Sequence, residues 1–181
     1  AYRRVCQDAQ GWLRDGLMDQ LFPMMYFQGR QFFPFAIDWS ENSYGRIVTP
    51  GLGIYFLSPK EKDWPLEIIS REMHVLRQYG LGHAFFRSKF FTDNTKGIYD
   101  FTLKHNASPA LVPPMTWANS TAPAAPTCLA LDRNHVLTWQ KTVTGGDIYY
   151  NVYSSPSHPV DITDGRNLIA ARVSGNVVRV G

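Results

Sequence analysis

The chain has 181 residues, of which 44% are hydrophobic and 18% charged, a composition typical of one medium or two small folded domains and against intrinsic disorder. The net charge is only +3 and the Lys and Arg residues are scattered, whereas a nucleic-acid surface needs them clustered, so we expect no nucleic-acid partner. No apolar run approaches the roughly 20 residues of a membrane span, so we expect no membrane-spanning segment.

Residues 1–16 predict a helix, because their apolar residues recur on one helical face. The run 17–27 follows, and nine of its eleven residues are apolar. Such a run is typical of a strand that is covered on both faces, as in a parallel sheet. Pro23 weakens this prediction, since proline lacks the backbone N–H that a central strand donates.

Two later apolar runs, 46–56 and 80–89, repeat the pattern. Each run is followed by a loop and a helical pattern, which is the signature of a parallel α/β fold. Asp63 is predicted to cap the second helix, with Pro65 just inside it. The predicted helices cover residues 34–44, 66–76 and 95–104.

The periodicity changes after a small, Pro-rich segment at 118–126, which we interpret as a linker between a first domain, 1–117, and a second, 127–181. From residue 127 onward, apolar residues alternate in short runs separated by turn signals, which indicates a β-sandwich. About five strands can be recognised, whereas such sandwiches usually have about seven. We therefore expect an incomplete sandwich.

Three βα units are too few to close an eight-stranded barrel. Two architectures remain: a small three-layer fold, or the last part of a larger barrel. The helical start of the chain favours the second. In either case the sheet edges would be open, which predicts self-association.

The candidate binding residues lie where the three predicted strands end, because ligands bind at the carboxyl ends of parallel strands. Tyrosine rings there could stack on a sugar, and an arginine could hold carboxylates or hydroxyls through its planar guanidinium. For each residue taken singly, a core tyrosine or a surface arginine is an equally good interpretation. The candidates are Tyr26, Gln28, Tyr55, Arg87 and Ser88.

Sugar hydrolysis normally needs two facing carboxylates, and the sequence offers no convincing pair. Asp93 follows the third strand and is a weak catalytic candidate, although a helix N-cap is favoured at roughly two to one. Gly51 and Gly53 lack the third glycine of a dinucleotide loop, so that interpretation is rejected. Cys6 and Cys128 stand in no metal-ligand spacing, and we expect neither a metal nor a cofactor.

Residues 11–26 resemble the segment of the glycosyl-hydrolase-like family 10 proteins in which a helix and a glycine precede a strand ending in Pro-x-x-Tyr. Residues 51–55 and 82–88 resemble the last two barrel strands of that family, and residues 109–117 its post-barrel strap. The second domain resembles the fibronectin type III-like sandwich that follows in many members. The resemblance covers nearly the whole chain and is closest to the Bacteroidetes-type envelope lipoproteins of the family.

The resemblance implies the last three units of a (β/α)8 TIM-type barrel, a carbohydrate partner and export to the cell envelope, either periplasmic or at the surface. The strands of that family that would carry the catalytic carboxylates have no counterpart here. We therefore expect a fragment of a glycoside hydrolase that does not catalyse alone. The alternatives are a non-catalytic carbohydrate-binding or adhesion module, and a purely structural spacer.

Overall fold

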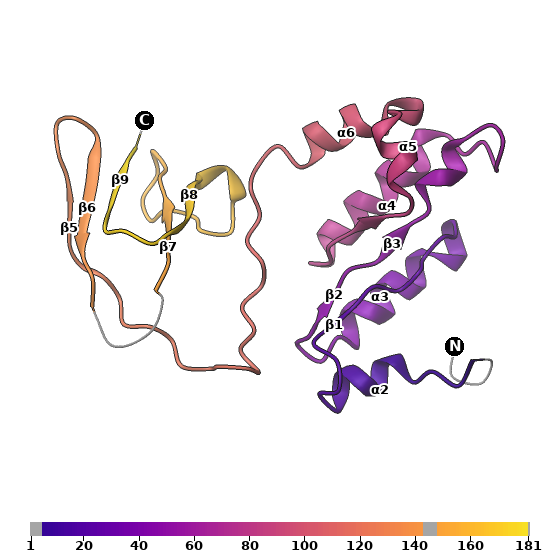
Figure 1. Ribbon diagram of the computed structural model, residues 1–181, viewed down its shortest axis with the longest axis horizontal. Coiled ribbons are helices and arrows are strands. Elements are labelled where there is room, and N and C mark those ends of the chain that lie inside the picture. Colours follow the sequence, from indigo (N-terminus) through magenta and orange to yellow (C-terminus); the bar gives the residue numbers. More distant parts are fainter. Residues whose placement is uncertain (1–4, 143–147, 181) are drawn as a thin grey trace. The chain divides into compact units, whose positions relative to one another are not determined.

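The computed structural model describes residues 5–142 and 148–180, and the chain divides into two compact units, Ala1–His105 (unit 1) and Asn106–Gly181 (unit 2) (Figure 1). Residues 106–126, between the last helix of unit 1 and the first strand of unit 2, contain no helix or strand. The domain boundary predicted at 118–126 stays a prediction.

Three segments of unit 1 pair as short parallel strands in their chain order (Figure 1). The middle segment is divided in two, and its second half also forms a parallel bridge from Gly51 to Met24 of the first segment. The carboxyl ends of all three segments therefore lie at the same edge of the sheet. The strands are β1 (Gln20–Leu21) beside β2 (Ile47–Val48), and β3 (Gly51–Leu52) beside β4 (Ala84–Phe85).

The strands are far shorter than the apolar runs that predict them, and prolines explain two of the breaks. Pro23 follows β1 closely, and Pro50 separates β2 from β3. Neither can donate to a neighbouring strand. The carbonyl of Pro23 nevertheless accepts from Gly51 N at 2.8 Å, so the segments stay in contact beyond the break.

Helices cover this small sheet. The predicted helix at 34–44 forms with Pro34 in its first turn, where a missing N–H costs nothing. The predicted helix at 66–76 is also confirmed, and Gly80, with a φ of +68°, follows its end. The helices are α2 (Ala9–Arg14), α3 (Phe33–Glu41), α4 (Leu66–Gln78), α5 (Ser88–Thr92) and α6 (Ile98–His105), with 3₁₀ turns η1 (Gly29–Gln31), η2 (Ile54–Leu57) and η3 (Thr95–Gly97).

The prediction that Asp63 caps α4 is wrong. Pro65 occupies the N-cap position, and its side chain makes no capping hydrogen bond. The Asp63 carboxylate instead accepts from Lys96 Nζ at 2.6 Å, and the same ammonium group reaches the carbonyls of Asp63 and Trp64. This contact ties the loop before α4 to a residue 33 positions later in the chain.

The core of unit 1 lies between the strands, η2, α3 and α4. The buried face of α4 presents Ile69, Met73 and Leu76 to it. Because these residues recur at helical spacing, one face of the helix is apolar and the other is solvated. The remaining core residues are Met25, Phe32, Ala36, Leu52, Ile54, Phe56, Leu57, Trp64 and Ile98.

The strands of unit 1 form no closed barrel within the described residues. Apolar side chains beside β1 are exposed, among them Phe22 at 57% and Met24 at 73%. Over the part of the chain that the structure describes, β1 pairs with β2 alone. The assignment to a partial TIM-type barrel, and self-association through the open edges, both stay predictions.

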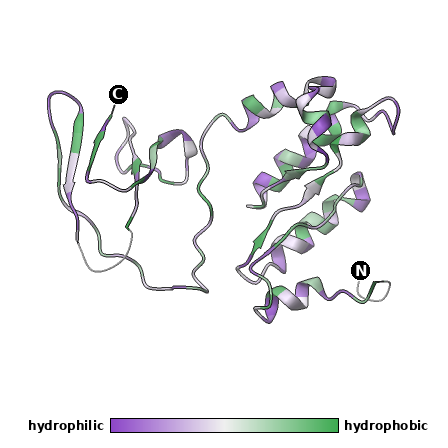
Figure 2. Ribbon diagram, in the orientation of Figure 1, coloured by the Kyte–Doolittle hydropathy of each residue, from purple (hydrophilic) through white to green (hydrophobic). Residues whose placement is uncertain are grey.

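Unit 2 contains antiparallel strands in a three-stranded sheet, ordered β5-β6-β9, and a separate pair, β7-β8. Hydrophobic residues occupy much of β9 and part of β6 (Figure 2). Trp139 is buried against Tyr150, with their rings edge to face at 5.1 Å. A fibronectin type III-like sandwich stays a prediction. The strands are β5 (Thr127–Leu131), β6 (Val136–Gln140), β7 (Tyr150–Tyr153), β8 (Leu168–Val173) and β9 (Val177–Arg179), with a 3₁₀ turn η4 (Gly165–Asn167) before β8.

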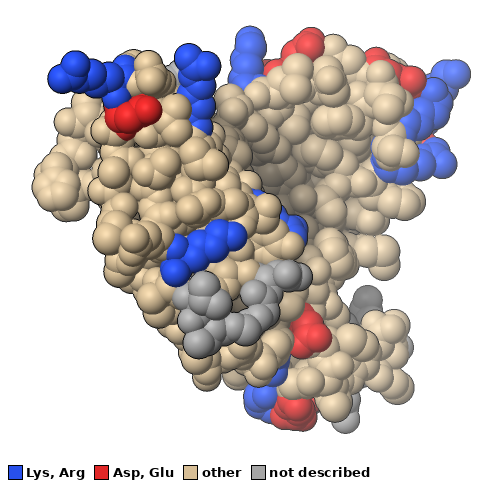
Figure 3. All heavy atoms as spheres, turned by 60° about the vertical axis from the view of Figure 1, so that its left-hand side comes forward, with Lys and Arg blue, Asp and Glu red and all other residues tan. Residues whose placement is uncertain are grey.

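Among the described residues, no helix has both the length and the apolar character needed to cross a membrane. On the face shown in Figure 3, Lys and Arg side chains lie singly or beside Asp and Glu rather than in one continuous patch.

We predict that Leu76→Ala lowers the free energy of unfolding of unit 1 by about 2–5 kcal/mol, because it leaves a cavity beneath α4. Leu103→Ala on α6 is the control, since that side chain is 57% exposed and its loss should change stability by less than about 1 kcal/mol. Chemical denaturation followed by the helical circular-dichroism signal measures both. Equal effects of the two substitutions would contradict this packing.

Candidate functional site

Three aromatic rings meet where the parallel strands end, and we call Tyr26, Tyr55 and Phe86 the strand-end cluster. Tyr26 stacks on Phe86 with ring centroids 5.5 Å apart. Tyr55 meets both rings edge to face, at 6.0 Å from Tyr26 and 5.7 Å from Phe86. Each residue follows a different strand segment, so the parallel order of the strands brings the three rings together.

Two glycines allow Tyr26 to lie against the second strand segment. A Cβ atom on Gly53 would stand 3.1 Å from Tyr26 Cβ, and one on Gly51 would stand 3.3 Å from Tyr26 Cε1. Both distances are shorter than ordinary carbon contacts, so a larger residue would require Tyr26, or Phe56 beside Gly53, to shift by a few tenths of an ångström. The Gly-x-Gly spacing thus provides room for the ring of Tyr26, a role that the sequence did not indicate.

The strand-end cluster is open to solvent on one side. Tyr26 and Tyr55 are half-buried, and Phe86 is 48% exposed. Burial, and secondarily the nearby Tyr55, raises the pKa of the Tyr26 hydroxyl above its usual value, so this hydroxyl stays protonated at neutral pH. The cluster therefore presents an uncharged surface of ring faces and edges with phenolic hydroxyls.

The structure brings only some of the predicted binding residues together. Tyr26 and Tyr55 lie together, and Arg87 and Ser88 directly follow Phe86 in the chain. Arg87 stands directly before α5, and its guanidinium lies 5.4 Å from the ring centroid of Phe90. Gln28 is exposed before η1 and lines a different pocket, described below.

Sequence reasoning missed Phe86 as a member of the cluster. The signal was present, because an aromatic residue stands at the end of each of the three strand segments. Side chains alternate between the two faces of a strand, but β4 has only two residues. Its pattern is therefore too short to predict which of Phe85 and Phe86 faces the tyrosines.

Asp93 does not cap the helix that follows it, so the N-cap interpretation is wrong. It ends α5, and its carboxylate forms an exposed ion pair with Lys89 one helical turn earlier. The capping oxygen is that of the Asn94 side chain, which accepts from Tyr99 N at 2.9 Å. With its carboxylate engaged in this way, Asp93 gains no support from the geometry as a catalytic acid or base, and that role stays a prediction.

We predict that Gly53→Ala destabilises unit 1 by about 1–3 kcal/mol and weakens the near-ultraviolet circular dichroism of its aromatic residues, because the new methyl group crowds Tyr26 and Phe56. Gly82→Ala is the control, since the nearest atoms to its Cβ would be side-chain atoms of Thr49 at 3.4 Å or more. An unchanged aromatic signal in the Gly53 variant would contradict the proposed contact.

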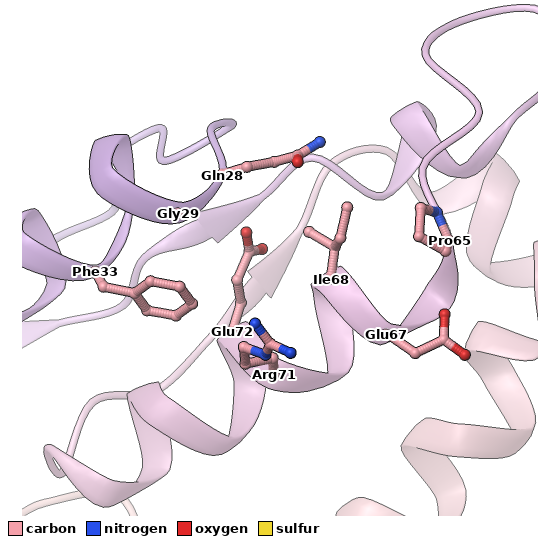
Figure 4. Close-up of a pocket in the computed structure, with 8 residues that line it drawn as sticks. All are labelled: Gln28, Gly29, Phe33, Pro65, Glu67, Ile68, Arg71 and Glu72. Atoms are coloured by element: carbon pink, nitrogen blue, oxygen red, sulfur yellow. The ribbon is translucent and has the colours of Figure 1, made fainter.

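A buried carboxyl group occupies a second site, between α4 and the start of α3. Glu72 is 1% exposed, and no described residue lies within hydrogen-bond reach of either carboxyl oxygen. Figure 4 shows its side chain rising from α4 between Phe33 and Ile68, toward Gln28. The Glu72 pocket has a volume of about 410 Å³. It is lined by Gln28, Gly29, Phe33, Pro65, Glu67, Ile68, Arg71 and Glu72.

Burial raises the pKa of Glu72 from 4.5 to about 8, because the low-polarity surroundings disfavour the charged form. The group is therefore largely protonated at neutral pH. The sequence contains the signal for this position, since Glu72 lies three residues after Ile69 and four before Leu76, on the apolar face of α4. A charged residue on a buried helical face marks a candidate site.

We predict that Glu72 makes unit 1 less stable as the pH rises. Its pKa is higher in the folded chain than in the unfolded chain, so folding takes up a proton between about pH 5 and pH 8. The free energy of unfolding should fall across that range by up to about 1.4 kcal/mol per pH unit.

Glu72→Gln should remove this slope, because a neutral amide of similar shape does not titrate. Glu67 lines the same pocket but is exposed, so Glu67→Gln should leave the dependence of the free energy of unfolding on pH as it is in the unmodified chain. Denaturation at several pH values measures all three proteins. A slope that survives in Glu72→Gln would assign the pH dependence to other groups.

Three histidines of unit 1 also lie near one another. The ring centroid of His105 is 4.7 Å from that of His74 and 6.1 Å from that of His83. Burial, together with nearby Arg77 and the two other histidines, lowers the pKa of His105 to about 4, so it is neutral at physiological pH. Across the described ranges, no group of three or more His, Cys, Asp or Glu side chains has an arrangement that could hold a metal ion.

Comparison of the chain with protein-family models, with curated proteins and with solved structures found no match. The resemblance to the glycosyl-hydrolase-like family 10 proteins therefore stays a prediction.

Proposed function

We propose that the chain binds a glycan at the strand-end cluster, as part of a glycoside hydrolase-like protein. The observation that carries this proposal is the meeting of Tyr26, Tyr55 and Phe86 at the carboxyl ends of three parallel strand segments. Ligands of parallel α/β folds bind at this edge. Pyranose rings have apolar C–H faces that suit flat aromatic surfaces, and hydroxyls that suit phenolic groups and guanidinium.

Hydrolysis would need two carboxylates on either side of the scissile bond. Asp93 is paired with Lys89, and Glu72 is enclosed between helices rather than presented at the strand ends. We therefore propose that this chain contributes sugar contacts, and that the catalytic pair belongs to a part of the protein outside these 181 residues. On the resemblance alone, we propose that such a protein acts on polysaccharide or on glycan of the cell envelope, where it would reside.

A second candidate function is that of a non-catalytic carbohydrate-binding or adhesion module. The uncharged character of the strand-end cluster favours it, since stacking surfaces alone are sufficient for binding. Release of reducing ends from a panel of polysaccharides separates the two. Activity of a longer protein but not of this chain would favour the hydrolase, and binding without activity in either would favour the module.

We predict that Phe86→Ala weakens binding of the chain to soluble oligosaccharides about 5- to 30-fold, because it removes the exposed ring of the cluster, worth about 1–2 kcal/mol of contact. Phe22→Ala is the matched control, since Phe22 is similarly exposed but lies beside β1 outside the cluster, and its variant should bind normally. Titration calorimetry measures both.

Tyr55→Phe and Tyr55→Ala then separate the contribution of the hydroxyl from that of the ring. If Phe86→Ala and Phe22→Ala bind every oligosaccharide as well as the unmodified chain does, the strand-end cluster is not the glycan site.

A further inference from the structure

The Glu72 pocket holds a carboxyl group that unit 1 does not satisfy. Both oxygens are enclosed, and no donor of the described residues reaches them. A buried polar group without a partner costs about 1–3 kcal/mol, and more when it is charged. Among the residues that line the pocket, Phe33, Ile68 and Pro65 carry no side-chain hydrogen-bond donor.

We propose that the Glu72 pocket binds a primary ammonium group carried on a small apolar or ring-shaped molecule. The proposal is independent of glycan binding at the strand-end cluster, since the two sites share no residue. An ammonium group offers three donors to the two carboxyl oxygens and neutralises the charge of the ionised carboxylate. The volume of about 410 Å³ accommodates a six-membered ring with its substituent.

The carboxyl group of Glu72 favours a cation over a neutral alcohol. A hydroxyl would satisfy one carboxyl oxygen at a time, whereas an ammonium also converts the group to its charged form and pairs with it. The aromatic face of Phe33 and the hydrocarbon walls of Ile68 and Pro65 suit the apolar part of the molecule. The side-chain amide oxygen of Gln28, beyond the carboxyl group in Figure 4, could accept a further hydrogen bond.

The other charged groups of the pocket balance. Glu67 and Arg71, both exposed and both on α4, carry opposite charges, and the lining residues from η1, α3 and the loops around them are uncharged. The titration of the pocket near neutral pH therefore belongs to Glu72. Binding of an ammonium should release the proton that Glu72 holds in the free protein.

The test compares cyclohexylammonium with cyclohexanol, two probes of the same shape that differ in charge. Titration calorimetry with the whole chain should show binding of the amine, and binding of the alcohol weaker by about tenfold or more. At pH 7, repeats in buffers of different ionisation enthalpy should detect release of about one proton per amine bound. The affinity for the amine should rise by about tenfold between pH 6 and pH 7, where aliphatic amines stay protonated.

Two variants locate the effect. Glu72→Gln keeps the shape and hydrogen-bonding capacity of the side chain, and should weaken binding of the amine by about tenfold or more and abolish proton release. Glu67→Gln removes the exposed carboxylate of the same pocket, and should bind within about threefold of the unmodified chain and still release the proton.

Equal affinity for the amine and the alcohol would overturn the proposal, as would undiminished binding to Glu72→Gln. So would binding of the amine without proton release, which would mean that Glu72 is already ionised, for example through pairing with Arg71. Because proton release is measured on the unmodified chain, the proposal can fail even where a variant does not fold.

Discussion

The contact of Tyr26 with the glycines of the second strand segment determines the geometry of the strand-end cluster. Because Gly51 and Gly53 have no side chain, Tyr26 can lie directly against their backbone. A Cβ atom at either position would crowd it. From that position the ring stacks on Phe86 and meets the edge of Tyr55. The three strand segments are thus connected beyond their few hydrogen bonds, by aromatic contacts at the edge where a ligand would bind.

Part of this arrangement could be predicted from the sequence. The periodic helix α4, the proline in the first turn of α3, and the placement of Tyr26 and Tyr55 at strand ends follow from local patterns. The length of the strands does not, because Pro23 and Pro50 interrupt pairing inside runs that remain apolar. Hydrophobic periodicity reports which residues are covered, and it does not report where the hydrogen bonds of the strands end.

The capping predictions for Asp63 and Asp93 fail for a shared physical reason. Aspartate favours helix N-caps, but each of these carboxylates forms an ion pair with a lysine instead. Lys89 is one turn from Asp93, whereas Lys96 lies 33 residues from Asp63 and reaches it only in the folded chain. A capping propensity is a local preference of the order of 1 kcal/mol, so an ion pair of similar strength, whether local as for Asp93 or long-range as for Asp63, is enough to override it.

Glu72 shows the opposite case, in which a local pattern was informative and its violation marks a site. A carboxyl group among Ile69, Met73 and Leu76 conflicts with the apolar face that holds α4 against the core, and neither of its oxygens has a hydrogen-bond partner among the described residues. A glutamine there would avoid the cost of burying a charge. Because that cost disappears when a cation pairs with the carboxylate, the same residue that weakens the free protein at high pH would strengthen a complex with an ammonium.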